Sequence, residues 1–276
     1  MSLSASDRTM SIHRIAAIAL FALLNTAGIA AEPSITSPTY KPTVLITGSN
    51  RGIGFEFVRQ LSARDWQIIA TTRNPDGATA LAGLAADDAD IVIEKLDVTS
   101  DEDIAALAAK YLEHPIDILL LNAARGPAPK TAMSQLAHLD WELAGSFFQV
   151  NAIGPMKVTQ ALMENVKASN MKQVIVMSSD SGSFIAGSQL PILYRYKASK
   201  AALNMYFHTL AFETKKRGVM TVMLHPGLVG TNEQLAKFPG ALKTEDSVSQ
   251  MLNVMDGLTL EDNGRFISYE GESMPW

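Results

Sequence analysis

The stretch TVLITGSNRGIG, Thr43 to Gly54, decides the fold. Its apolar, β-rich run ends in a turn that holds Gly48 and Gly52, and the amphipathic stretch GFEFVRQLSA starts at Gly54. Glycine permits a tight turn and lets backbone N–H groups approach a pyrophosphate at the positive end of the next helix. We therefore predict a strand, a phosphate-binding turn and a helix. An ordinary glycine-rich connection is the alternative.

The alternation of strand and helix continues along the chain. The runs WQIIATT, IVIEKLD, IDILLLN, QVIVMS and VMTVMLH predict strands, helical stretches such as DEDIAALAAKYL separate them, and GRFISY predicts a last strand. Two longer helices are expected, from about Asp140 to Val166 and from about Tyr194 to Lys216. This order predicts an α/β fold, a Rossmann-type doubly wound parallel sheet in a single domain over residues 41–276. Ligands of such sheets bind at the carboxyl ends of the strands.

Composition limits the partners. The 276 residues are 47% hydrophobic and 18% charged, which is typical of a globular protein with a full core. The net charge of -5 and the lack of a dense Lys/Arg cluster argue against nucleic acid as a partner. The sequence has no cysteine, which excludes disulfides and thiolate ligands, and its five histidines form no metal-binding motif. We expect no metal site.

Residues 1–31 are expected to lie outside the fold. Basic residues precede the apolar run IAAIALFALL, and small residues follow in AGIAAEP, a pattern typical of a secretory signal peptide cleaved near Ala30. An N-terminal membrane anchor is the alternative, although the run is short for a membrane span. Residues 32–40, rich in Pro, Ser and Thr, predict a linker.

Two arginines stand where the ribose of a dinucleotide would lie. In this fold the second strand commonly ends in an acidic residue that binds the ribose 2′-hydroxyl. Here it ends in TTRNP, which offers Arg73, and Arg51 lies inside the glycine turn. A guanidinium can bind a 2′-phosphate that a carboxylate would repel, so NADP is favoured over NAD, with two merely solvated arginines as the alternative. Asp97, after the third strand, could bind the adenine amino group or simply begin a turn.

The segment YRYKASK, Tyr194 to Lys200, offers two tyrosines and two lysines on one predicted helix. Residues four apart share a helix face, whereas residues six apart lie about 120° from each other. Tyr196 and Lys200 can therefore act together, while Tyr194 and Lys197 point elsewhere. A phenol has a pKa of about 10 and needs a nearby cation to exchange protons near neutrality. Tyr196 is the candidate acid and base and Lys200 its partner, although such pairs also arise by chance on amphipathic helices.

Two further polar positions face the same crevice. The strand QVIVMS leads into Ser178 and Ser179, and strand alternation points one of the two hydroxyls into the crevice without choosing which. Asn151 lies inside an otherwise apolar long helix, where its amide must find partners or cost stability. A helix kink or a hydrogen bond between helices near Gly154 and Pro155 is the alternative reading of Asn151.

These motifs occur in a recognisable order. TGSNRGIG, LDVT, LNAA, FFQVN, SS, YKASK and HPGLVGT resemble the motif series of the classical short-chain dehydrogenase/reductase family, from about Lys41 to the C-terminus. The ending, GRFISYEGESMPW, is similar to the branch that includes carbonyl-reductase-like and C-factor-like members. The resemblance implies an NADP(H)-dependent oxidoreductase that interconverts a carbonyl compound and its alcohol by hydride transfer.

The resemblance also implies roles for single residues. Tyr196 would be the general acid that protonates the carbonyl oxygen as the hydride arrives, and Lys200 would bind the nicotinamide ribose and lower the pKa of the tyrosine. Ser179 would hold the carbonyl, and Asn151 would hold a water that connects Lys200 to solvent. The cofactor-binding residues implied by the motifs are Gly48, Asn50, Arg51, Gly52, Ile53, Gly54, Arg73, Asp97, Val98, Asn122, Ala123, Tyr196, Lys200, Pro226, Gly227, Val229 and Thr231.

Two departures from the family pattern are visible. The family's Asn-Asn-Ala-Gly is LNAA here, Leu121 to Ala124, so a methyl group replaces a hydrogen beside the cofactor, and we expect it to be tolerated. The interval from Ser179 to Tyr196 is a few residues longer than usual, which places an insertion in FIAGSQLPIL. That loop is expected to shape substrate specificity.

The substrate is expected to be a neutral, hydrophobic ketone or aldehyde. The candidate pocket residues are apolar, and Arg125 is the one basic residue placed to bind an anionic group. The candidate pocket residues are Phe184, Ile185, Leu190, Ile192, Leu228 and Phe238. The alternative function is an NADP-binding regulatory or signalling protein of the same fold with little turnover.

Location and assembly are further expectations. The apolar N-terminal segment predicts export or anchoring with membrane association, but an exported enzyme would meet little NADPH. An organelle that holds the cofactor is therefore the alternative. The family commonly forms dimers or tetramers through its long helices, so a homo-oligomer is expected.

Overall fold

The computed structural model describes residues 40–128 and 132–276, and its centre is one parallel β-sheet. Seven strands in this part of the chain lie in the order β3-β2-β1-β4-β5-β6-β7, with every neighbouring pair parallel. The strands are β1 (Thr43–Ile46), β2 (Gln67–Thr72), β3 (Ile91–Lys95), β4 (Ile118–Leu121), β5 (Gln173–Met177), β6 (Met220–His225) and β7 (Phe266–Ser268). The predicted Rossmann-type sheet is confirmed. The strand order reverses between β1 and β4, which opens a crevice at their carboxyl ends.

The middle strands are buried along their whole length. Every residue of β4 and β5 is buried, and so are the last three residues of β1. Strands that are covered on both faces have to be apolar at every position, since neither side meets water. This is why the continuous runs ILLL and QVIVM in the sequence identify strands without any alternation of polar and apolar residues.

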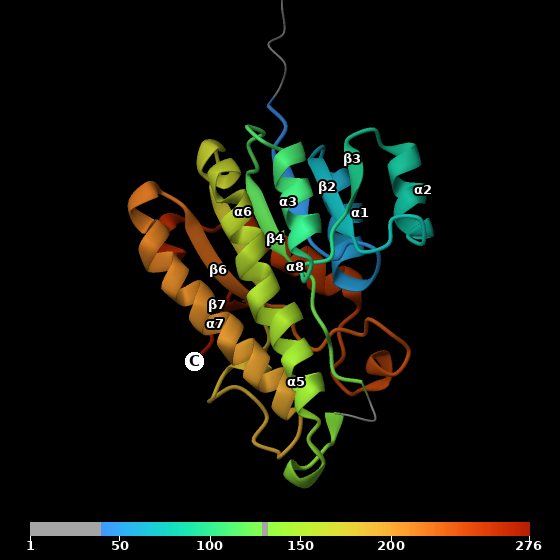
Figure 1. Cartoon of the computed structure of the whole chain (residues 1–276), viewed down its shortest axis with the longest axis vertical. Coiled ribbons are helices and arrows are strands. Elements are labelled where there is room, and N and C mark those ends of the chain that lie inside the picture. Colours follow the sequence, from blue (N-terminus) through green and yellow to red (C-terminus); the bar gives the residue numbers. More distant parts are fainter. Residues whose placement is uncertain (1–39, 129–131) are drawn as a thin grey trace, which may run out of the picture. The chain divides into compact units, whose positions relative to one another are not determined.

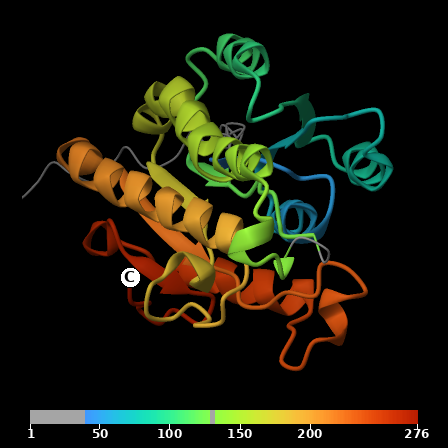
Figure 2. The same ribbon diagram turned by 60° about the horizontal axis from the view of Figure 1, so that its bottom comes forward.

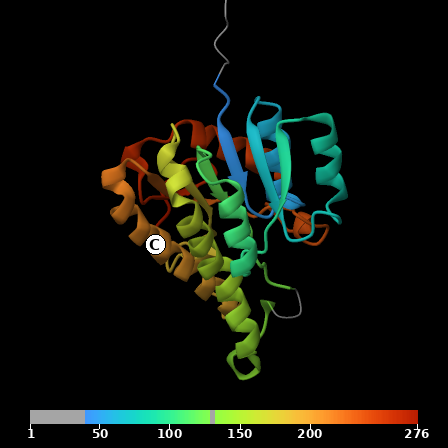
Figure 3. The same ribbon diagram turned by 45° about the horizontal axis from the view of Figure 1, so that its top comes forward.

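Helices cover both faces of the sheet, and Figure 3 shows α3, α6 and α7 on its near side. On that face Leu162 of α6 and Phe207 of α7 pack with Leu45 of β1. On the other face Phe57 of α1 and Met251 of α8 join a second core. The helices are α1 (Gly52–Ser62), α2 (Thr79–Asp87), α3 (Asp101–Lys110), α5 (Trp141–Phe148), α6 (Gly154–Ala168), α7 (Tyr194–Thr214) and α8 (Thr244–Asp256).

The long helix expected from about Asp140 to Val166 contains an irregular turn. Asp140 caps α5 by accepting a hydrogen bond from the backbone N–H of Leu143 at 2.9 Å. A π-helical turn, Gln149–Ile153, then joins α5 to α6. Such a turn widens the helix by one residue and is frequent at functional sites. It places the buried Asn151 at the junction of the two helices.

The predicted signal peptide or anchor, residues 1–31, and the linker before Tyr40 lie outside the described residues. Within residues 40–128 and 132–276, no helix combines the length and the apolar character needed to cross a membrane. The described chain enters β1 at the end of the sheet opposite the crevice (Figure 1).

Gly154, the first residue of α6, is required by close packing. A Cβ at this position would lie 2.6 Å from the backbone oxygen of Val98 and 2.9 Å from that of Gln149. We expect Gly154→Ala to lower the free energy of unfolding by about 1 to 3 kcal/mol, because backbone atoms would have to move.

The matched control is Gly145→Ala in α5, where nothing lies within 4 Å of the added Cβ. Alanine favours a helix more than glycine does, so this variant should be at least as stable as the wild type. Urea denaturation measures both variants. Equal stability of Gly154→Ala and the wild type would contradict this account of the packing.

Candidate active site

The glycine turn lies at the carboxyl end of β1, in contact with the end of β4. Gly48 has a φ of 73°, in the left-handed region that favours glycine, and a Cβ there would lie 3.0 Å from the Cα of Ala123. The side-chain amide of Asn122 donates to the backbone oxygens of Thr47 and Gly48, each at 3.0 Å. The hydroxyl of Thr47 accepts in turn from the backbone N–H groups of Asn122 and Ala123. The LNAA motif therefore holds the turn in shape.

Gly54 brings the start of α1 against this turn. A Cβ at Gly54 would lie 2.3 Å from the backbone oxygen of Gly48 and 2.5 Å from Nδ2 of Asn122, so no other residue fits. The N-cap residue of α1, Arg51, makes no side-chain hydrogen bond to the first turn of the helix. The first N–H groups of α1 consequently remain available to an anion. The turn and the helix start together fit a phosphate group.

The residues expected around the adenosine end lie on the rim of the crevice. Arg51 and Arg73 are both exposed, at the start of α1 and directly after β2. Asp97 is half-buried, and its Oδ1 accepts hydrogen bonds from the backbone N–H and the hydroxyl of Thr99 at 2.9 and 2.7 Å. These contacts are those of a turn, which was the second of the two roles considered for Asp97. Binding of the adenine amino group by Asp97 stays a prediction. Ala124 is exposed, so its methyl group does not crowd the interior.

The segment HPGLVGT after β6 closes the crevice from the other side. Gly227 has a φ of 79°, and the buried Val229 forms a parallel bridge with Leu242. This arrangement brings Thr231 next to the glycine turn, since a Cβ on Gly52 would lie 3.4 Å from Cγ2 of Thr231. The segments that follow β1 and β6, far apart in the sequence, therefore lie side by side at the carboxyl ends of the strands (Figure 2).

Tyr196 and Lys200 lie together in the first turns of α7. Nζ of Lys200 lies 5.9 Å from the centre of the Tyr196 ring and donates a hydrogen bond of 2.7 Å to the backbone oxygen of Met177, the last residue of β5. Lys197 points away, and its ammonium bonds to the backbone oxygen of Leu190 at 3.1 Å. The structure brings together the pair that helix periodicity selected.

The structure separates the roles of the two serines after β5. The hydroxyl of Ser178 donates to Oδ1 of Asn204 on α7 and is buried. The side chain of Ser179 is hydrogen-bonded to Tyr196. Ser179 is thus the serine that shares the crevice with the phenol, in agreement with the family pattern. Strand alternation alone could not make this choice.

Burial shifts both ionisable groups of the pair. It raises the pKa of Tyr196, which a hydrogen bond donated by Ser179 would lower, and it lowers the pKa of Lys200 to about 8. The family pattern led us to expect a lowered pKa for Tyr196. The structure shows the opposite direction, because removal of the phenolate from water outweighs the stabilising contacts. Tyr196 is therefore protonated at neutral pH.

The side chain of Asn151 forms hydrogen bonds within the protein. Its Oδ1 accepts from the backbone N–H of Arg125 at 2.6 Å, and its Nδ2 donates to the backbone oxygen of Arg125 and to the hydroxyl of Ser199 on α7. This pattern matches the alternative reading, a hydrogen-bonded junction at an irregular helical turn. The water that the resemblance assigns to Asn151 stays a prediction.

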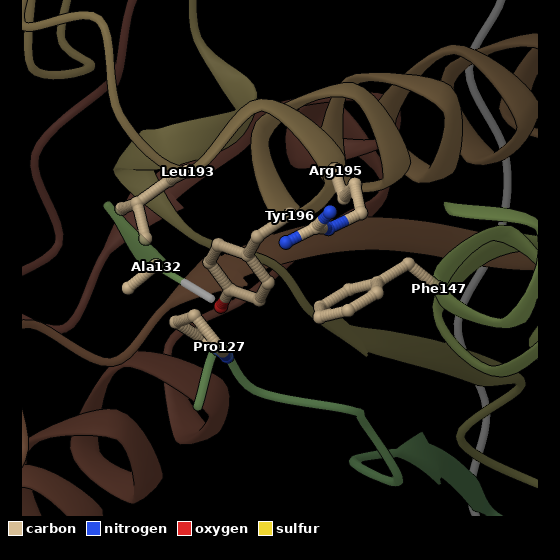
Figure 4. A pocket seen from close by; sticks show the side chains of 6 residues that line it. All are labelled: Pro127, Ala132, Phe147, Leu193, Arg195 and Tyr196. Carbon is tan, nitrogen blue, oxygen red and sulfur yellow. The ribbon is translucent and has the colours of Figure 1, made fainter. Parts of the chain in front are cut away.

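A small cavity lies beside the hydroxyl of Tyr196 (Figure 4). Its lining residues are Pro127, Ala132, Phe147, Leu193, Arg195 and Tyr196. Its volume of about 10 Å³ leaves room for a single water molecule.

The apolar residues expected to line the substrate pocket do not line this cavity. The exposed fractions are 84% for Phe184, 71% for Ile185, 62% for Leu190, 57% for Phe238 and 45% for Leu228, and Ile192 is half-buried. The loop of residues 183–193 points outward because its polar groups are bonded locally, for example Ser183 to the backbone N–H of Ala186 at 2.8 Å and Lys197 to Leu190. Phe184 lines a second pocket instead, with Met205, His208 and Trp276.

Sequence reasoning missed Arg195 and Asp180. Arg195 is buried, lines the cavity, and reaches toward the space between Tyr196 and Phe147 (Figure 4). It lies in the first turn of α7, where a long side chain can bend past the helix end. Asp180 follows Ser179 directly, and its place beside the serine pair was the available signal.

Comparisons with known proteins agree with this geometry. The chain matches the short chain dehydrogenase family over residues 42–240. It is 34% identical over 251 residues to an uncharacterized oxidoreductase of Schizosaccharomyces pombe, with 84% of this chain and 96% of the relative covered. It is also 34% identical over 171 residues to C-signal of Myxococcus xanthus, with 62% of this chain and 99% of the relative covered. The structure of NADPH-bound carbonyl reductase from chicken fatty liver superimposes with a TM-score of 0.77 at 29% identity, covering 86% of this chain and 99% of that one.

The chain therefore belongs to the short-chain dehydrogenase family. The match over residues 42–240 includes the glycine turn, the serine pair and the YKASK segment, which are the elements that meet in the crevice. The family that the motif series indicated is confirmed.

The buried Lys200 is expected to cost the fold stability at neutral pH. Its pKa is lowered from 10.5 to about 8, so the unfolded chain holds this proton more tightly than the folded one. The penalty is fully present below pH 8 and disappears as the pH rises to 10.5. The free energy of unfolding of Lys200→Met minus that of the wild type should therefore be about 3 kcal/mol larger at pH 7 than at pH 10.5.

Urea denaturation of both proteins across this pH range measures the difference, and all other titrating groups cancel in the comparison. A stability difference that stays constant from pH 7 to pH 10.5 would show that Lys200 titrates at its ordinary value.

Proposed function

We propose that this protein is an NADP(H)-dependent oxidoreductase that interconverts a ketone or aldehyde and its alcohol. The observation that carries the proposal is the convergence of Tyr196, Lys200 and Ser179 at the carboxyl end of β5. The glycine turn after β1 lies on the same edge of the sheet, separated by the single strand β4. The chicken fatty liver relative, a carbonyl reductase with NADPH bound, supports both the cofactor and the reaction class.

The chain offers a fitting site for the cofactor. The glycine turn and the uncapped start of α1 suit the pyrophosphate, because a side chain on Gly48 or Gly54 would fill the space against Ala123 and Asn122. Arg51 and Arg73, exposed on the rim, would bind the 2′-phosphate that distinguishes NADP from NAD. When bound, NADPH supplies the hydride that is added to the carbonyl carbon.

The residues of the chain handle the proton. Tyr196 holds its proton at neutral pH, because burial raises its pKa, and donates it to the carbonyl oxygen as the carbon is reduced. The ammonium of Lys200, 5.9 Å from the ring centre, stabilises the phenolate that remains until solvent reprotonates it. Ser179 holds the carbonyl oxygen beside the phenol. One hydride and one proton added to the carbonyl give the alcohol, so the step balances.

The substrate class that we propose is a neutral, hydrophobic carbonyl compound. The exposed apolar side chains of Phe184, Ile185 and Leu190, in the loop between Ser179 and Tyr196, favour an apolar ligand. Two cations nevertheless lie close by, since Arg195 lines the cavity and the guanidinium carbon of Arg125 lies 5.5 Å from the centre of the Phe147 ring. A substrate panel should therefore pair each neutral ketone with an analogue that carries a carboxylate.

Tyr196→Phe is expected to lower kcat for reduction of an accepted ketone by a factor of about 100 or more, because the proton donor is lost. Binding of NADPH, followed by its fluorescence, should be unchanged. Tyr194→Phe is the matched control, since Tyr194 is exposed and points away from Lys200. Equal turnover by Tyr196→Phe and the wild type would remove Tyr196 from the mechanism.

Arg73→Ala is expected to raise KM for NADPH about tenfold and to leave KM for NADH unchanged, because the lost charge-assisted hydrogen bond involves the 2′-phosphate alone. Arg64→Ala provides the control, since Arg64 bonds to Asp256 on α8 instead. Steady-state kinetics with both cofactors gives the answer. A parallel loss with NADPH and NADH would place Arg73 outside the 2′-phosphate site.

The second candidate is an NADP-binding regulatory or signalling protein, and the similarity to C-signal favours it. The same assays separate the two. NADPH binding without turnover of any carbonyl, alike in the wild type and in Tyr196→Phe, would support the regulatory function.

A further inference from the structure

Asp180 directly follows Ser179 and belongs to none of the motifs that define the site. It begins a short 3-10 helix, Asp180–Gly182, after β5. Its Oδ1 accepts a hydrogen bond from the hydroxyl of Ser179 at 2.9 Å and another from the backbone N–H of Ser181 at 2.6 Å. Its own backbone N–H donates to Nδ1 of His225 at 3.2 Å. These bonds fix the carboxylate beside the serine.

Ser179 has one proton and two neighbours that can receive it. A hydroxyl carries a single O–H donor. The side chain of Ser179 is hydrogen-bonded to both Asp180 and Tyr196. A bond in which Ser179 donates to Tyr196 stabilises the phenolate, but a carboxylate is a stronger acceptor than a neutral phenol. While Asp180 holds the proton of Ser179, the serine oxygen can only accept from Tyr196, and that arrangement favours the protonated phenol.

We propose that Asp180 is a positioning residue that, while no substrate is bound, accepts the hydroxyl hydrogen bond of Ser179 and thereby keeps Tyr196 in its protonated, proton-donating form. The inference rests on the proposed function of Tyr196 as acid and base. It deepens that function, because a site with a protonated phenol at neutral pH is set for reduction. Oxidation of the alcohol needs the phenolate and is then favoured only at higher pH.

The charged surroundings of Tyr196 explain why such a residue has an effect. The charged or titratable groups near it are Lys200 and Arg195 on α7, Arg125 after β4, His225 at the end of β6, and Asp180. Burial lowers the pKa of His225, so this side chain is neutral at pH 7 and accepts at Nδ1. A nearby cation favours a phenolate, whereas the charge of Asp180 raises the pKa of Tyr196.

The test is a direct titration of the phenol in the full-length chain. The absorbance of tyrosinate is recorded against pH, and subtraction of the Tyr196→Phe curve isolates Tyr196 from the other five of the six tyrosines. Asp180→Ala should raise the ionisation constant of Tyr196 about tenfold, because the phenolate gains the Ser179 proton and loses a negative neighbour. Asp180→Asn should lie between Asp180→Ala and the wild type, since an amide oxygen still accepts but carries no charge.

Two further variants isolate the route through the serine. In a Ser179→Ala background the effect of Asp180→Ala should shrink, because there is no serine proton left to release. Asp256→Asn, which removes an exposed carboxylate at the end of α8, should leave the titration unchanged. An unchanged midpoint in both Asp180 variants would overturn the proposal. So would an equal shift with and without Ser179, which would mean that Asp180 acts by its charge alone.

Carbonyl reduction measured on the same samples keeps this inference separate from the proposed function. A wild type that reduces ketones, with a phenol that does not respond to Asp180, would overturn the role of Asp180 and leave the function intact. A phenol that responds in a wild type without turnover would support the coupling of Asp180 to Tyr196 through Ser179, while the proposed function would fail. If Asp180→Ala does not fold, as circular dichroism would show, Asp180→Asn carries the test alone.

Discussion

The hydrogen bonds between Asn122 and the backbone of the glycine turn are the constraint on which the site depends. They join the end of β4 to the end of β1 at the point where the strand order reverses. Because Gly48 packs against Ala123 and Gly54 packs against Asn122, the shape of the turn is tied to the end of β4. A phosphate-binding turn fixed in this way requires little ordering when a nucleotide arrives, which lowers the cost of binding.

A second constraint is the burial of an acid and a base side by side. Exclusion of water raises the pKa of Tyr196 and lowers that of Lys200, so both groups move toward their uncharged forms. A buried lysine costs stability that an apolar residue would not. Proteins commonly retain such groups at functional sites, where activity and stability compete. The fold tolerates this cost because the two cores on either side of the sheet are extensive.

Much of the architecture could be predicted from the sequence because it follows from local rules. Strands buried on both faces appear as unbroken apolar runs, and the spacing of Tyr196 and Lys200 follows from helix periodicity. The failures share a different cause. The direction of the loop around Phe184 and Ile185, and the reach of Arg195, depend on tertiary contacts that no sequence period encodes. The choice between Ser178 and Ser179 came from family resemblance, since their alternation is compatible with either.

The π-helical turn at Gln149–Ile153 has a consequence for the length of the chain. Each residue advances a helix by about 100°, so one additional residue in a turn rotates every later side chain relative to the earlier ones. Because of that rotation, α5 packs against α7, while α6 packs against α3 and the sheet. If one residue of this turn were removed, the side chains of α5 or those of α6 could still face their packing partners, but not both sets at once. The packing therefore constrains the number of residues between Trp141 and Ala168 as strictly as it constrains their identity. Insertions and deletions among relatives should fall outside α5, α6 and the turn between them.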